Sequence, residues 1–345
     1  MAGFSHILGQ EKPKQFLKKV LAGKKIPHAY LFTGMPGVGK TTMARAMAMA
    51  LNCGEPRDHE GCGQCPACRQ IAGGRFPDFL VIEPEGKNIK IDQVREFNRM
   101  LGFAPAVGKY RVCVFRQAET MTGEAANSFL KTLEEPPPAN VIILNATEPL
   151  DLLPTTVSRC QRVSFQPLST GDIAHWLTGE KGEDPEKAEV LGRISGGSLG
   201  RALLMQGGDF LEKREKWLLG VTKLPALSNI EAVDMALGLA AGEKTGGFSA
   251  GGTEPGILDL VSTWRSWYRD LMLCKAEGPE NLLINMDFSR RLKSVVETYI
   301  IKNLVESVDA LDRADRDLRI LRNPKLVMAD TALRLRRLVG TEERP

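Results

Sequence analysis

A glycine-rich segment near the N-terminus has the residue types and the spacing of a phosphate-binding loop. Residues 34–41 read Gly-Met-Pro-Gly-Val-Gly-Lys-Thr and match the pattern G-x-x-x-x-G-K-[ST] in full. Glycines let the backbone turn tightly and aim its N–H groups at phosphate oxygens, while Lys40 would reach the β and γ phosphates and Thr41 would hold Mg²⁺. We expect ATP or ADP, with Mg²⁺, to contact Gly34, Gly37, Gly39, Lys40, Thr41 and Thr42. The motif alone leaves open a loop that has lost its ligand.

The positions that should hold the metal and activate water carry the wrong residue types. In nucleotidases with this loop, an acid after the second buried strand holds the metal, and a second acid usually orients water. Here the apolar run 111–115 is followed by Arg116 and Gln117. Arginine repels Mg²⁺, and glutamine cannot serve as a general base. We expect neither Glu119, beyond the strand end, nor Glu124, at a helix start, to restore hydrolysis.

Four of the seven cysteines are clustered, with the spacing Cys53-x8-Cys62-x2-Cys65-x2-Cys68. Four thiolates in one short loop match tetrahedral zinc, and closely spaced Cys-x-x-Cys pairs direct two sulfurs at one ion. An iron–sulfur cluster is the chemical alternative, because Cys-x2-Cys-x2-Cys also occurs in ferredoxins. Since all four ligands come from the protein, we expect a structural zinc site with no open position for catalysis.

The bulk composition is typical of a soluble protein with two or three domains. The chain has 345 residues, of which 43% are hydrophobic and 26% charged, and its net charge is +4. That charge permits contact with nucleic acid but does not argue for it, because a clustered basic face would be the decisive sign. No signal peptide and no run of roughly 18 apolar residues is present, so we expect a cytoplasmic protein without a membrane segment.

Residues 1–166 alternate apolar strands with helical patterns, which predicts an α/β domain with a mostly parallel sheet. The expected strands are 29–33, 79–83, 111–115, 141–145 and 162–165. The expected helices between them include 42–51, 91–101 and 123–133. The phosphate loop would therefore stand between the first strand and the helix that follows it, as its chemistry requires.

After Pro167 the pattern becomes helical. Short amphipathic helices are expected at 170–177, 185–194 and 196–205, and they form a small second domain over 167–208. Residues 209–345 show helical periodicity with almost no strand signal, which predicts an all-α third domain. A Gly-rich segment at 241–256 is expected to be a mobile loop. One apolar stripe is expected on a single helix face of the bundle core: Leu292, Val295, Val296, Tyr299, Ile300, Leu304, Val308 and Leu311.

Several segments together resemble the bacterial clamp-loader subunits of DNA polymerase III, which belong to the extended AAA+ class. They are Phe-Ser-His-Ile-Leu-Gly-Gln at 4–10, His-Ala-Tyr-Leu-Phe at 28–32, the four-cysteine module, Asn-Ser-Phe-Leu-Lys-Thr-Leu-Glu-Glu-Pro-Pro at 127–137 and Ser-Arg-Cys at 158–160. The Leu-Glu-Glu-Pro-Pro and Ser-Arg-Cys segments are far more specific than the phosphate loop. The C-terminal third matches only through its helix pattern and Asn-Pro-Lys-Leu at 323–326.

The resemblance implies roles for single residues. Arg159 of Ser-Arg-Cys resembles the arginine finger that reaches the nucleotide of a neighbouring subunit. Arg201 resembles the second sensor, which touches the chain's own nucleotide from the helical lid. Either Asn145 or Thr147 resembles the first sensor, which probes the γ-phosphate. The same resemblance implies a AAA+ nucleotide-binding domain at 1–166, a helical lid at 167–208 and an oligomerising collar at 209–345.

The residues at 116 and 117 indicate which kind of subunit this is. Motor subunits of the family keep an acidic pair there, whereas the delta-prime type often does not, so we expect a non-motor, delta-prime-type subunit. Its implied partners are gamma/tau and delta subunits in a hetero-pentamer, which loads a sliding clamp on primed DNA during replication. One alternative is a gamma/tau-type motor that hydrolyses ATP itself. Another is an unrelated DNA-binding or recombination protein, which would bind DNA in a strongly salt-sensitive way.

Overall fold

The computed structural model of the chain describes residues 3–23, 25–248 and 254–340. Its contacts divide the chain into two compact units. The first unit runs to Asp172 and also includes Gly197–Gly200, and the second contains Ile173–Gly196 and the residues from Arg201 onward.

The first unit is built on a parallel sheet of five strands. These are β1 Ala29–Thr33, β2 Phe79–Ile82, β3 Arg111–Phe115, β4 Asn140–Ala146 and β5 Gln161–Ser164, in the order β2-β3-β4-β1-β5. Strands β1, β3 and β4 are apolar runs that are buried along their whole length, as expected where helices cover both faces of a parallel sheet. Phe32 pairs with Asn145, so the carboxyl ends of β1 and β4 lie side by side.

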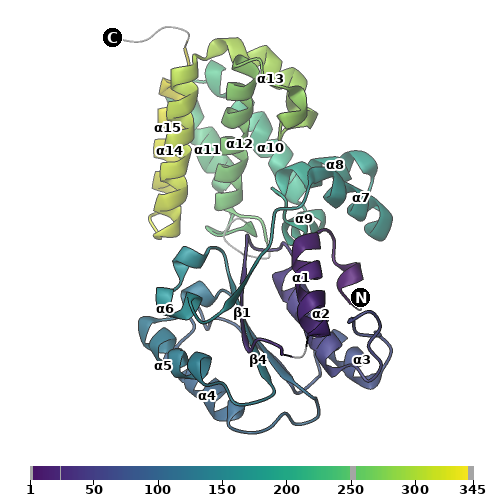
Figure 1. The fold of residues 1–345 in the computed structure, drawn as a ribbon. Helices are drawn as coiled ribbons and strands as arrows, with labels where there is room; N and C mark the ends of the chain where they lie inside the picture. The colour runs from purple at the N-terminus through teal and green to yellow at the C-terminus, as the bar shows by residue number, and fades with distance from the viewer. Residues whose placement is uncertain (1–2, 24, 249–253, 341–345) are drawn as a thin grey trace. The chain divides into compact units, whose positions relative to one another are not determined.

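Helices cover both faces of this sheet (Figure 1). On one side lie α1 Glu11–Ala22, α2 Lys40–Asn52 and α3 Pro66–Ala72, and on the other α4 Ile91–Leu101, α5 Gly123–Glu134 and α6 Pro154–Val157. Alternate residues of β1 face opposite layers: Tyr30 and Phe32 join one apolar core, whereas Ala29 and Leu31 join the other. Short 3-10 turns complete the unit: η1 Phe4–His6, η2 Ala118–Thr120 and η3 Pro149–Asp151. The α/β fold expected from the sequence is confirmed.

The described residues of the second unit form helices and connecting segments, with no β-strand among them. Most of α7 Thr170–Lys181 belongs to it, with α8 Pro185–Ile194, α9 Leu199–Gln206 (from Arg201 on), α10 Phe210–Lys223, α11 Asn229–Ala240, α12 Ile257–Lys275, α13 Ser289–Val295, α14 Ile301–Arg319 and α15 Pro324–Arg337. Its core centres on α12, where Trp264 Nε1 donates to the Trp217 carbonyl over 2.9 Å. In the part of the chain that is described, no helix is both long and apolar enough to cross a membrane. The separate lid and collar domains stay a prediction.

The apolar stripe from Leu292 to Leu311 does not form one helix, so this expectation was wrong. Helix α13 ends at Val295, a 3-10 turn follows, and α14 begins only at Ile301. Between them Tyr299 is extended, with φ −125° and ψ 148°. The Gly340 N–H donates to the Thr298 carbonyl over 3.0 Å, so contact with the C-terminal segment replaces helical pairing here. The stripe nevertheless supplies the core, because Leu292, Tyr299, Leu304 and Leu311 are buried.

Part of the expected mobile loop at 241–256 lies outside the described residues, namely 249–253. In its described part, Phe248 is buried and packs against Phe210, with ring centroids 5.5 Å apart. The N–H groups of Phe248 and Gly256 donate to Asp259 Oδ2 over 2.8 and 3.1 Å. This end of the segment therefore contributes to the core of the second unit.

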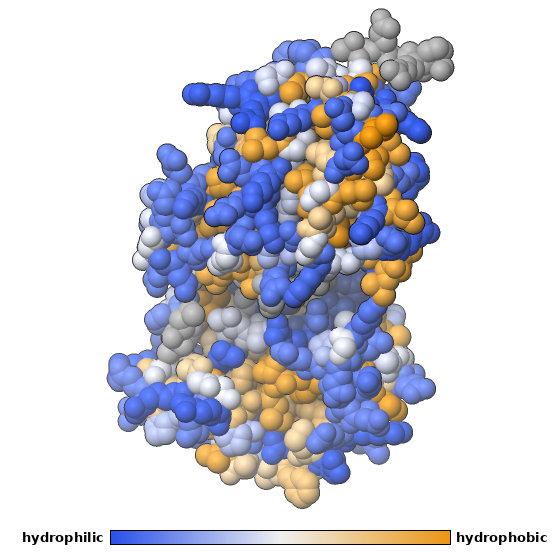
Figure 2. Space-filling view, turned by 180° about the vertical axis from the view of Figure 1, so that it is seen from behind, coloured by the Kyte–Doolittle hydropathy of each residue, from blue (hydrophilic) through white to orange (hydrophobic). Residues whose placement is uncertain are grey.

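Helices α14 and α15 carry apolar side chains on their outer surfaces. The view from behind shows orange side chains among blue ones over this part of the second unit (Figure 2). The exposed apolar residues there are Ile301 and Val305 on α14, Ile320 and Leu321 in the connection after it, and Leu326 on α15.

Candidate nucleotide site, finger arginine and metal cluster

The phosphate loop follows β1 and ends on the first turn of α2, as the sequence predicts. Gly34, Gly37 and Gly39 have φ values of +138°, +80° and +104°, which residues with a Cβ rarely adopt. The loop therefore folds only because glycine stands at these positions. Because the loop ends where α2 begins, the positive end of the α2 dipole lies at the loop, which suits an anion.

Lys40 and Thr41 point their polar atoms to this loop. Lys40 Nζ donates to the carbonyls of Gly34 and Met35, the second over 3.0 Å. Burial lowers the pKa of Lys40 to about 8, and the carboxylate of Glu119 opposes that shift. Thr41 Oγ1 accepts a hydrogen bond from Asn145 Nδ2 at 3.1 Å, whereas Thr42 is exposed one residue further along α2.

Both candidates for the first sensor lie beside the loop. Asn145, near the end of β4, is buried and contacts Thr41. The Thr147 carbonyl accepts from the Gly34 N–H over 3.0 Å, and Thr147 Oγ1 donates to Glu119 Oε1 over 3.1 Å. The arrangement brings an amide, a hydroxyl and a carboxylate to the edge of the phosphate loop, where they could respond to a bound phosphate group.

The two residues after β3, Arg116 and Gln117, are both exposed. The Arg116 guanidinium pairs with Glu83, at the end of β2, and both side chains are about half exposed. Gln117 is exposed and has a positive φ of 52°. Strand β3 ends at Phe115 as expected, so the two positions after it contain no acid.

Glu119 lies beyond the end of β3 in the sequence, yet the structure brings it to the edge of the phosphate loop. The left-handed turn at Gln117 and the 3-10 turn Ala118–Thr120 carry Glu119 back to the ends of the strands. No glycine or asparagine marks this turn in the sequence, so little signal was available. A short polar stretch between β3 and α5, too short for a helix, was the one indication of a tight return.

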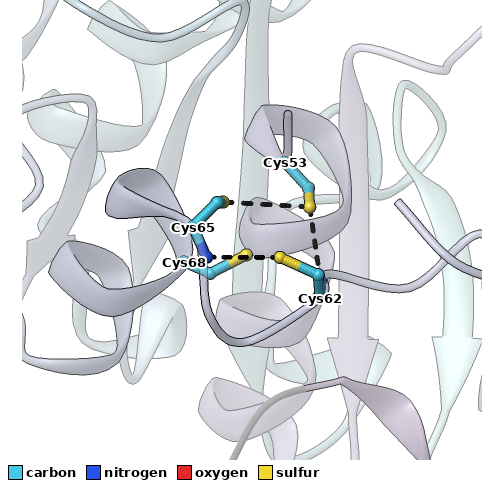
Figure 3. Close-up of side chains that lie close together, drawn as sticks. All are labelled: Cys53, Cys62, Cys65 and Cys68. Atoms are coloured by element: carbon cyan, nitrogen blue, oxygen red, sulfur yellow. Dashed lines mark hydrogen bonds between the residues drawn. The ribbon is translucent and has the colours of Figure 1, made fainter. Parts of the chain in front are cut away.

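The four clustered cysteines meet as expected, although not within one loop. Cys53 follows the end of α2, Cys62 and Cys65 lie in the connection, and Cys68 belongs to α3, where Pro66 starts the helix. All four sulfurs lie within 4.8 Å of one another, and none is in a disulfide (Figure 3). The N–H groups of Cys62 and Cys65 donate to Cys53 Sγ and Cys62 Sγ, each over 3.3 Å. This cluster could hold one metal ion.

Arg159 lies just after α6 and is held by its own chain. Its Nε donates to Glu134 Oε1 over 3.0 Å, and Nη2 donates to the same oxygen. Its Nη1 donates to the Thr155 carbonyl over 2.8 Å and to Ser158 Oγ over 3.3 Å. A third of the Arg159 side chain is exposed to solvent. The Ser-Arg-Cys and Leu-Glu-Glu-Pro-Pro segments are thus joined through one ion pair.

Comparison with known proteins finds DNA polymerase III subunits. A family model described as "DNA polymerase III, delta subunit" matches residues 9–169. The chain is 29% identical to DNA polymerase III subunit tau of Bacillus subtilis over 346 residues, which cover 94% of this chain and 59% of the relative. It is 37% identical to subunit delta' of Pseudomonas aeruginosa over 200 residues, covering 57% of this chain and 61% of the relative. Over these residues the chain is similar to both the delta' and the tau subunits of DNA polymerase III.

The fold of this chain also has a solved counterpart. A gamma subunit-related protein of Thermotoga maritima superposes with a TM-score of 0.50 over 94% of this chain and 98% of that one, at 19% identity. The chain spans about three fifths of the length of the two relatives named above. The delta' relative is more similar in sequence, whereas the tau relative matches more of this chain, so these matches do not separate the two subunit types.

Arg201, the expected second sensor, belongs to the second unit. The residues before it belong to the first unit and bind the phosphate loop: Ser198 Oγ donates to the Pro36 carbonyl, and the Gly200 N–H to the Gly37 carbonyl, both over 2.9 Å. Burial lowers the pKa of Arg201, and Asp259 opposes that shift. The sensor role of Arg201 stays a prediction.

Proposed function

We propose that this chain is a delta-prime-type, non-motor subunit of the DNA polymerase III clamp loader. It supplies Arg159 in trans to ATP bound by a neighbouring subunit while the assembly loads a sliding clamp on primed DNA. The observation that carries this proposal is the pair Arg116 and Gln117 after β3, where a motor has two acids.

The chain's own site is suited to hold a nucleotide rather than to split it. The loop N–H groups, Lys40 and the hydroxyls of Thr41 and Thr42 would bind the phosphates of ATP or ADP and its Mg²⁺. Arg116 is paired with Glu83, and Gln117 is exposed, so neither orients a water molecule at the loop. Bound nucleotide would then act as a structural ligand that stabilises the folded chain.

Arg159 has the properties of a residue that acts on another chain. A guanidinium is always charged and offers several donors, so it can stabilise charge that develops on a γ-phosphate. Glu134 and the Thr155 carbonyl hold Arg159 in one orientation in the free chain. Because this restraint restricts the side-chain rotamers before assembly, less conformational entropy is lost when the finger meets a phosphate.

The four-cysteine cluster fits a structural zinc ion. Tetrahedral zinc with bonds of about 2.3 Å places its sulfurs about 3.8 Å apart, and Cys53 Sγ and Cys65 Sγ are separated by 3.9 Å. An iron–sulfur cluster needs a wider set of sulfurs, because several irons stand between them. Zinc here would fix α3 to the end of α2.

The helical part of the chain would supply the lid at 167–208 and the collar at 209–345. Ile301 and Val305 lie four residues apart on α14 and are 53% and 46% exposed. Apolar side chains in such positions suit contact with collar helices of gamma/tau and delta subunits in a hetero-pentamer.

The decisive experiment reconstitutes the loader with Arg159→Ala and measures ATP hydrolysis with clamp and primed DNA. Loss of a trans arginine slows hydrolysis by about 10³-fold at the neighbouring site that receives it. The kcat of the assembly should therefore fall by the fraction of total hydrolysis that this one site contributes. Arg162→Ala is the matched control, because Arg162 is exposed on the neighbouring strand β5. Turnover equal to that of the control would reject the finger role.

A second candidate, a gamma/tau-type motor, is favoured by one observation, namely the position of Glu119 beside the loop. The purified chain alone tests it directly. Brisk ATP consumption would identify a motor, whereas nucleotide binding with little turnover supports the delta-prime type.

A further inference from the structure

Two buried oxygen atoms beside the phosphate loop have no hydrogen-bond partner within the described residues. They are Glu119 Oε2 and Asn145 Oδ1. Buried polar atoms are paired in the great majority of cases, so each exception calls for an explanation, such as an ion or a water. The exposed fraction of Asn145 is only 3%, so bulk water does not satisfy its oxygen.

These atoms are attached to the loop by short chains of hydrogen bonds. Glu119 Oε1 accepts from Thr147 Oγ1 at 3.1 Å, and the Thr147 carbonyl accepts from the Gly34 N–H at 3.0 Å. Asn145 Nδ2 donates to Thr41 Oγ1 at 3.1 Å, whereas the side-chain oxygen of Asn145, Oδ1, has no hydrogen-bond partner within the described residues. A carboxylate, an amide oxygen and a threonine hydroxyl are the hard oxygen donors that Mg²⁺ prefers, directly or through bound water.

We propose that Glu119 is the acidic residue of this nucleotide site and couples the binding of nucleotide to a divalent cation. Glu119 would bind the cation, which Arg116 and Gln117 are unable to do. This inference rests on the nucleotide binding proposed above. Asn145 and Thr147 are positioning residues: the hydrogen bond from Asn145 orients the Thr41 hydroxyl, and the hydrogen bond from Thr147 orients the Glu119 carboxylate.

The electrostatics of the loop agree with this role. The Glu119 charge raises the pKa of Lys40 against the effect of burial, so the carboxylate interacts electrostatically with the ammonium group that would bind phosphate. A carboxylate in that position repels a nucleotide that arrives without a cation. A divalent cation between the carboxylate and the phosphates attracts both, so the repulsion between Glu119 and the nucleotide becomes a net attraction.

One acid is also compatible with weak hydrolysis. A motor has a second acid that usually orients the attacking water. Here the second acid in sequence, Glu124, is exposed in the first turn of α5. Glu119 would therefore support binding of the magnesium nucleotide without restoring turnover.

The test measures the affinity of ADP for the full chain by calorimetry, with Mg²⁺ and with EDTA. Glu119→Gln keeps an oxygen for Thr147 and removes the charge. We expect this variant to bind ADP a few-fold more tightly in EDTA and more weakly in Mg²⁺, so that the Mg²⁺ enhancement falls by about tenfold, within the usual range of coupling between ligands. Glu124→Gln, the matched control, should keep the enhancement of the unmodified chain.

A second variant guards against a folding defect. Thr147→Val removes the hydroxyl that orients Glu119 and should give an intermediate enhancement. If Glu119→Gln melts early, the Thr147→Val result decides, and full enhancement there overturns the role of Glu119. If Glu119→Gln folds normally and keeps the enhancement of the control, the role is also overturned, although nucleotide binding stands. If the unmodified chain binds ADP in neither condition, the proposed nucleotide site fails and Glu119 loses its role with it.

Discussion

Nucleotide affinity should fall as the pH rises through the pKa of Lys40. Burial disfavours the ammonium form, so the pKa of this lysine is about 8 rather than the ordinary 10.5. Phosphate binds the charged form, so binding must raise the pKa of Lys40 and draw a proton from solution. The nucleotide phosphates have the opposite effect, because they gain charge as the pH rises to about 7.

The size of the effect follows from the fraction of charged lysine. With a pKa of about 8, roughly 90% of Lys40 is charged at pH 7 and about 9% at pH 9, so the affinity should fall by about tenfold between these values. At pH 8 about half a proton should be taken up for each nucleotide bound.

Stability of the chain without nucleotide should change in the other direction. Since the folded pKa of Lys40 lies below its unfolded value, the unfolded state binds more protons between pH 8 and about 10.5. The charged lysine therefore destabilises the fold below pH 8, and that penalty disappears as the pH rises.

Calorimetry in two buffers of different ionisation enthalpy measures both affinity and proton uptake. Lys40→Arg is the control, because its guanidinium stays charged over the whole range. Its affinity should be lower and nearly independent of pH from 7 to 9. If the unmodified chain bound nucleotide equally well at pH 7 and pH 9, without proton uptake, the pKa of Lys40 would be ordinary and the reasoning refuted.

Three further outcomes are expected. Glu134→Gln should lower the kcat of the reconstituted loader at the served site by about tenfold with little change in KM, because the finger arginine loses a charged partner, whereas exposed Glu135→Gln should change neither. Elemental analysis should find one zinc per chain, and Cys65→Ser should reduce that content and lower the melting temperature by several degrees; iron with visible absorbance would contradict this. Burial raises the pKa of the buried Asp78, but three backbone N–H donors and Arg111 lower it more, so the net shift is downward. At neutral pH, Asp78→Asn should therefore lower the free energy of unfolding by about 3 kcal/mol. This difference between the two proteins should shrink at low pH, as acid protonates the carboxylate of the unmodified chain.

Elements defined by neighbouring residues could be predicted well from the sequence. The expected strands 29–33 and 111–115 and the expected helix 91–101 have the bounds of β1, β3 and α4. In each case the signals that set the element, namely its apolar pattern and the glycine or polar residues that bound it, lie in or next to the segment itself. The phosphate loop belongs to the same class, because its glycines and the start of α2 are local features.

Features that depend on distant contacts could not be predicted. The break at Tyr299 coincides with pairing to Gly340, which no periodicity between Leu292 and Leu311 reveals. The return of Glu119 to the phosphate loop likewise depends on its bond to Thr147, which lies on another strand connection. The distance in sequence between Glu119 and the end of β3 therefore did not reveal that this side chain lies beside the phosphate loop.

A comparison of two arginines of the first unit, Arg116 and Arg159, shows why the partners of a residue matter more than its type. Arg116 pairs with Glu83, where both side chains are about half exposed, and such surface pairs contribute little to stability. Arg159 pairs with Glu134 and also binds the Thr155 carbonyl, so its direction is set by two points rather than one. A guanidinium that is restrained yet partly exposed can meet a phosphate on another chain with a small loss of rotamer freedom. In the proposed function the chain therefore combines an arginine that acts on a neighbouring subunit with a carboxylate that acts on a cation at its own loop, and the missing second acid separates these two proposed roles from hydrolysis.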